Sequence, residues 1–153
     1  MKVYLDVCCL SRLFDDQTQD KIRLETEAII GVLKRCVDGG WVLIGSDIIG
    51  LEISKNPDIV KKQKVLQLHD GSALRIKYNP TIKSRSEQFG KCGVKLFDSL
   101  HMASAEYAGA DVFLTTDAQL LKASARTDIR IRVENPLSFY LEVLNNEQFG
   151  GNL

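Results

Sequence analysis

The sequence predicts an α/β protein, a three-layer α/β/α sandwich around a mostly parallel central sheet. Short apolar runs that suit buried strands alternate along the chain with longer segments of helical periodicity. Such alternation favours parallel pairing, because each crossover helix returns the chain to the same end of the sheet. A length of 153 residues suits one domain. We expect a single domain over residues 1–145 and a loose C-terminal tail over 146–153.

The composition is that of an ordinary globular protein, with 44% hydrophobic and 26% charged residues. No apolar run approaches the roughly 20 residues of a membrane span, and Asp6 comes too early for a secretory leader, so we expect a cytoplasmic protein without membrane contact. Lys plus Arg and Asp plus Glu both number 20. This balance argues against a general nucleic-acid coat but allows a local basic patch.

Two predicted strands organise the first part of the chain. The run Val3–Leu5 predicts a buried strand that ends at Asp6. The elements that follow are a short helix around residues 10–14, a long amphipathic helix over 22–37, a strand over 41–44, a helix capped by Ser46 or Asp47, and a helix that begins at Pro57.

The second part of the chain continues the same alternation. Its predicted elements are a weak strand over 72–76, a helix from Pro80 to about Gly90, a helix that opens near Asp98, a turn at Gly109, strands over 111–115 and 126–133, and a closing helix from Asn135-Pro136. In a doubly wound sheet the first strand and the 111–115 strand can be neighbours at the switch point. Asp6 and Asp117 would then meet.

Four acidic residues occupy positions where parallel α/β sheets carry their chemistry, at strand ends or early in the next helix: Asp6, Glu52, Asp98 and Asp117. Apolar neighbours surround Asp6, Glu52 and Asp98, and carboxylates are seldom buried without a partner. Two carboxylates about 4 Å apart repel by about 4 kcal/mol at an effective dielectric constant of about 20. A divalent cation with oxygen ligands is the economical remedy. Taken singly, each acid also has a structural interpretation, as a strand end, a helix cap or a surface group.

The segment FDSLHMASAEYAGADVFLTTD, with Asp98 and Asp117, resembles the PIN-domain nucleases, which include the VapC-type toxins of toxin–antitoxin pairs. Asp6 after a hydrophobic strand and Glu52 at mid-chain extend the resemblance over most of the chain. The resemblance implies a PIN-like sandwich that cleaves RNA with one or two Mg²⁺ or Mn²⁺ ions. It also implies a homodimer and a cognate antitoxin partner.

The resemblance also implies roles for individual residues. Asp6, Asp98 and Asp117 match the invariant acids, Glu52 matches a helix-borne glutamate, and Thr115 matches a threonine that helps to hold the last acid. The chain departs from the family where Val7-Cys8 replaces a frequent Thr-Asn pair. Ser11 and Arg12 are the candidate replacements for the lost polar groups.

A basic segment leads directly to Asp98. Residues 75–95 carry six bases and one acid, Glu87, a local charge of +5; the bases are Arg75, Lys77, Lys83, Arg85, Lys91 and Lys95. This segment is a candidate binding surface for an RNA backbone, and Lys91 and Lys95 are its bases nearest to Asp98 in sequence. A solvated helix face explains the segment equally well. We interpret His101 as a satisfied helix histidine and His69 as a helix C-cap.

The sequence therefore predicts a metal-dependent endoribonuclease and a candidate toxin. One alternative is a PIN-fold module that binds RNA or protein without cutting. Another is an unrelated doubly wound domain, such as a phosphatase or receiver-like module. The absence of a D-x-D motif at Asp6-Val7-Cys8 argues against an aspartyl-phosphate enzyme.

Overall fold

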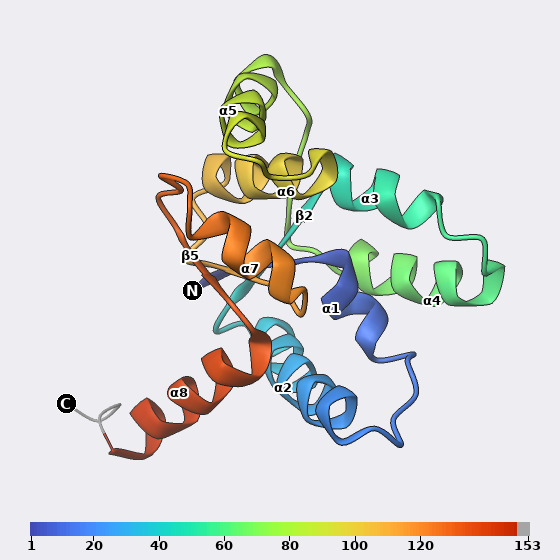
Figure 1. The fold of residues 1–153 in the computed structure, drawn as a ribbon. Helices are drawn as coiled ribbons and strands as arrows, with labels where there is room; N and C mark the ends of the chain where they lie inside the picture. The colour runs from blue at the N-terminus through green and yellow to red at the C-terminus, as the bar shows by residue number, and fades with distance from the viewer. Residues whose placement is uncertain (150–153) are drawn as a thin grey trace.

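The computed structural model describes residues 1–149, which form one five-stranded sheet in the order β3-β2-β1-β4-β5 (Figure 1). Every neighbouring pair of strands is parallel. The strands are β1 (Lys2–Leu5), β2 (Val42–Ser46), β3 (Leu74–Ile76), β4 (Val112–Leu114) and β5 (Arg132–Glu134). The predicted α/β/α sandwich is confirmed.

Helices cover both faces of this sheet. Within the described residues they are α1 (Val7–Arg12), α2 (Asp20–Val37), α3 (Asp47–Ser54), α4 (Ile59–Asp70), α5 (Pro80–Lys91), α6 (Leu96–Tyr107), α7 (Ala118–Ser124) and α8 (Pro136–Phe149). Figure 1 shows α5 and α6 packed together above the sheet, and α2 with α8 below it. None of the described helices is long and apolar enough to cross a bilayer.

Side-chain caps set several of the helix starts. Of the two predicted caps of α3, Ser46 is the one observed, because its Oγ accepts a hydrogen bond from the Ile49 N–H. The start of α4 was predicted two residues too early, because Asp58, not Pro57, is the residue whose carboxylate caps the helix. Gly109 adopts a φ of 68° after α6, a conformation that costs glycine little.

Two predicted boundaries near the C-terminus differ from the structure. The last strand was predicted over 126–133, but among the described residues it pairs only at Arg132–Glu134, because its partner there, β4, is three residues long. The predicted tail begins inside α8, which continues to Phe149; residues 150–153 lie outside the described residues. Arg35 of α2 holds this end of α8 through Glu147, with its Nη2 2.7 Å from Oε2.

The sheet changes its direction of winding between β1 and β4. From β1 the chain proceeds to β2 and β3 on one side, then returns to β4 on the other side. Leu5 is aligned with Leu114, so the residues that follow, Asp6 and Thr115, are neighbours at the carboxyl edge. The predicted adjacency of the two strands is confirmed, and it creates the crevice where α/β sheets bind ligands.

Candidate metal centre

Asp6 lies at the floor of this crevice and is only 5% exposed. Its Oδ1 accepts a hydrogen bond from the Val7 N–H (2.8 Å), which caps α1, and its Oδ2 accepts one from Thr115 Oγ1 (2.8 Å). The Cys8 thiol lies 3.3 Å from the same Oδ2. These contacts fix the direction of the carboxylate before any ligand arrives.

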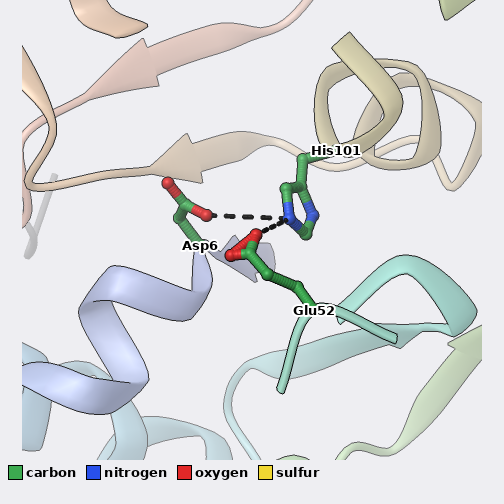
Figure 2. A group of neighbouring side chains, drawn as sticks. All are labelled: Asp6, Glu52 and His101. Carbon is green, nitrogen blue, oxygen red and sulfur yellow. Dashed lines mark hydrogen bonds and ion pairs between the residues drawn. The ribbon is translucent and has the colours of Figure 1, made fainter. Parts of the chain in front are cut away.

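His101 connects Asp6 with Glu52 (Figure 2). Its ring is fully buried in α6, with Nε2 2.7 Å from Glu52 Oε1 and 3.9 Å from Asp6 Oδ1. On the other side of the ring, Nδ1 lies 2.7 Å from Tyr4 Oη, which is itself 2.7 Å from Ser46 Oγ. A buried chain of hydrogen bonds therefore sets the orientation of the imidazole.

The electrostatics of the site favour a charged imidazole. Burial alone would lower the pKa of His101, but the hydrogen bond to Glu52 and the negative charges of Asp6, Glu52 and Asp98 raise it above its ordinary value. Burial raises the pKa of Tyr4 well above its ordinary value, so its hydroxyl stays neutral. In the absence of a cation, these charges therefore favour the protonated form of the imidazole.

Asp98 and Asp117 lie around this set. Burial raises the pKa of Asp98 to about 6, helped by the negative charges of Asp6 and Asp117. Asp117 Oδ1 caps α7 by accepting hydrogen bonds from the Gln119 and Leu120 N–H groups, and the Asp117 N–H donates to Thr115 Oγ1 (3.1 Å). Thr115 therefore touches the first and the last acid.

The tightest group of ligand atoms belongs to Asp6, Glu52 and His101, whose facing atoms all lie within 4.8 Å of one another. Two of the four predicted acids are in this group, whereas Asp98 and Asp117 are outside it, although the charges of Asp6, Asp117 and Glu52 act on Asp98. Sequence reasoning gave His101 a structural role; its position one helical turn after Asp98 was the signal available. Two carboxylates and an imidazole fit a divalent cation, because carboxylate oxygens suit Mg²⁺ and Mn²⁺ and imidazole suits transition metals.

The residues predicted to bind substrate have different surroundings. Arg12 pairs with Asp15 (3.1 Å) and with the buried Glu25 (3.2 Å), so its guanidinium ties α1 to α2. Ser11 is half-exposed on α1, and Lys91 is exposed at the end of α5. Lys95 precedes α6 and donates from Nζ to Gln119 Oε1 (3.3 Å).

Besides Lys95, two of the six bases in the segment 75–95 have partners within the fold. Arg85 is largely buried and pairs with Glu106 (2.7 Å) and Asp128 (3.0 Å). Arg75 Nη2 lies 2.7 Å from His69 Nδ1, and His69 is buried against β2, where its Nε2 lies 3.2 Å from the Ser46 nitrogen. His69 is therefore a packing residue and not the predicted helix C-cap.

Solved structures resemble this chain over most of its length. VapBC2 from Rickettsia felis, in a structure bound to a DNA fragment from its promoter, is 14% identical over 88% of this chain and 98% of that chain, with a TM-score of 0.60. VapBC-1 from nontypeable Haemophilus influenzae is 14% identical over 89% and 98%, with a TM-score of 0.58. A protein from Pyrobaculum aerophilum is 12% identical over 95% and 96%, with a TM-score of 0.52.

Comparisons of sequence alone give a different result: no family model matches the chain, and no curated protein matches it significantly. At such low identity the structural likeness concerns the fold. The chain has the VapC-like PIN-domain fold.

Proposed function

We propose that this chain is a divalent-metal-dependent endoribonuclease and the toxin of a cytoplasmic toxin–antitoxin pair. The observation that carries the proposal is the convergence of Asp6, Glu52 and His101 at the switch point of the sheet. Three separate parts of the chain supply these groups, and two further acids, Asp98 and Asp117, lie beside them. Crowded carboxylates in a crevice are the arrangement that metal-assisted phosphodiester hydrolysis requires.

The protein contributes position and charge. Asp6, Glu52 and His101 would hold the metal, with Asp98 and Asp117 available for a second ion or for a proton. A bound divalent ion would activate water and stabilise negative charge on a phosphate. Thr115 and the Val7 N–H fix Asp6, while Tyr4 fixes the ring of His101, so both groups are oriented before a metal binds. A metal on His101 Nε2 would replace the proton that this nitrogen shares with Glu52 Oε1.

Substrate and partner are inferred from likeness. RNA follows from the resemblance of the acid pattern to PIN-domain ribonucleases. Two of the similar solved structures are VapBC proteins, which supports a cognate antitoxin for this chain. Exposed apolar side chains near the site, among them Leu51 and Leu96, give a protein partner surface to cover. The homodimer stays a prediction.

The decisive experiment compares two aspartates that both cap helices. Asp6→Asn keeps an oxygen for the Val7 N–H but removes the charge at the site, whereas Asp58→Asn makes the same change at the exposed cap of α4. We expect Asp6→Asn to lower Mn²⁺-dependent cleavage of labelled RNA by roughly 100-fold or more and to weaken Mn²⁺ uptake in calorimetry. Asp58→Asn should retain both. Cleavage by Asp6→Asn at the wild-type rate would refute the assignment.

A second function has one observation in its favour. The 2.7 Å bond between Glu52 and His101 satisfies that carboxylate without a cation, as a non-catalytic PIN-fold module binding RNA or protein would require. The same calorimetry separates the two functions. Wild-type protein that binds RNA without taking up Mn²⁺ and without cleavage would be such a module.

A further inference from the structure

A hollow of about 280 Å³ opens between the start of α6 and helix α7. It lies beside the acid group, by which we mean Asp6, Glu52, Asp98 and Asp117. Asp98 contributes to its lining from α6, together with Lys95, which directly precedes that helix. The opposite wall belongs to α7 and the turn after it. Its polar lining residues on that side are Gln119, Lys122 and Arg126.

The three bases of this hollow differ from Arg12 and Arg85 in having no carboxylate partner among the described residues. Lys95, Lys122 and Arg126 are exposed, and within residues 1–149 none of them forms an ion pair. Arg12 and Arg85, in contrast, are tied to carboxylates. Three cations against one carboxylate leave the hollow positive in a protein whose net charge is zero. Such a concentration of one sign attracts an anion.

The cations are placed so that one anionic chain can contact all of them. Lys122 and Arg126 are four residues apart, so α7 and the turn after it carry them on adjoining turns. Lys95 reaches toward them from the opposite wall, where its contact with Gln119 Oε1 uses one of its three donor hydrogens. The remaining donors of all three side chains are available to phosphate oxygens.

We propose that this hollow binds the phosphodiester backbone of the RNA strand next to the scissile bond, through Lys95, Lys122 and Arg126. The inference rests on the proposed function, because it places the scissile phosphate at the acid group. Asp98 belongs both to the lining of the hollow and to the surroundings of the metal centre, so one strand can occupy the two sites continuously. Phosphate contacts of this kind position a strand without reading its sequence.

The test is a pair of double variants with equal loss of charge. Lys122→Gln/Arg126→Gln removes two cations of the hollow, and Lys21→Gln/Lys34→Gln removes two exposed cations from α2, on the other face of the sheet. Binding of a fluorescein-labelled oligouridylate is followed by anisotropy in EDTA over a range of salt concentrations. Each phosphate contact contributes about 0.7 to the slope of log affinity against log salt for a single strand.

We expect the hollow variant to lower that slope by about 1.4 and to weaken binding at low salt by roughly tenfold or more. The α2 variant should bind like wild type, and both should take up Mn²⁺ like wild type in calorimetry, with unchanged melting temperatures. Equal RNA affinity and slope in the hollow variant and wild type would overturn the inference, even if wild type cleaves RNA. A wild-type protein that neither binds Mn²⁺ nor cleaves, with the slope change present, would refute the proposed function and leave the backbone contact supported.

Discussion

The ionisation of Asp98 is clearly opposed by its burial and by the neighbouring acids. Burial and then the charges of Asp6 and Asp117 raise its pKa from 3.8 to about 6. Because the pKa is higher in the folded chain than in the unfolded chain, the neutral carboxyl favours folding. This stabilising contribution is fully present at a pH below the pKa of Asp98 in the unfolded chain. It is lost as the pH rises through the pKa of Asp98 in the folded chain. Above it, the ionised side chain destabilises the metal-free protein.

Asp98→Asn should therefore stabilise the chain in EDTA near neutral pH. The side chain is partly exposed, so solvent screening reduces the expected gain to about 1 kcal/mol, or about 2–4 °C in melting temperature. Thermal melts followed by circular dichroism across the acid range should show the gain disappear below the unfolded pKa. A lower melting temperature for Asp98→Asn at neutral pH would instead identify Asp98 as a helix cap whose charge stabilises α6.

At the scale of elements, β2 and α4 pack closely enough to exclude a methyl group. A Cβ at Gly45 would lie 2.6 Å from Ser72 Oγ and 2.8 Å from His69 Nε2. Both neighbours are held in place, because Ser72 Oγ donates to the His69 carbonyl and His69 Nε2 lies 3.2 Å from the Ser46 nitrogen. His69 stays neutral there, since burial and then the charge of Arg75 lower its pKa to about 4.

Gly45→Ala should cost about 1–3 kcal/mol of unfolding free energy through overpacking. Gly90→Ala is the matched control, because it lies within α5 and a methyl group there would meet no neighbouring side chain within 4 Å. Higher helix propensity should make that control more stable, by up to about 1 kcal/mol. Urea denaturation monitored by circular dichroism measures both values. Equal stability of Gly45→Ala and wild type would show that the β2–α4 contact yields easily.

The helices and strands of this fold can be predicted where a local sequence pattern, such as an apolar run, indicates them. The apolar run Val3–Leu5 and the hydrophobic segment before Asp117 predict strands, and their parallel pairing predicts that Asp6 and Thr115 meet. Contacts between side chains that are distant in the sequence produce no such local pattern. Arg85 reads as a substrate-binding base until the fold places Glu106 beside it, and the periodicity of α6 does not reveal that His101 contacts Glu52.

For the whole molecule, the candidate centre is a junction between distant parts of the chain. Asp6 follows β1, Glu52 lies in α3 and His101 lies in α6, so a cation held by all three binds the folded chain and not the unfolded one. Metal binding should then stabilise the entire domain. At a metal concentration of about 100 times the dissociation constant, the gain is about 2.7 kcal/mol.

Saturating Mn²⁺ should accordingly raise the melting temperature of wild type by about 5–10 °C. Glu52→Gln and His101→Asn should lose most of this rise, because each removes one ligand while leaving the sheet intact. Glu87→Gln, an exposed change on α5, should keep the full rise. The same shift in all four proteins would mean that Mn²⁺ binds elsewhere, and the acids at the switch point would then serve the fold without holding a metal.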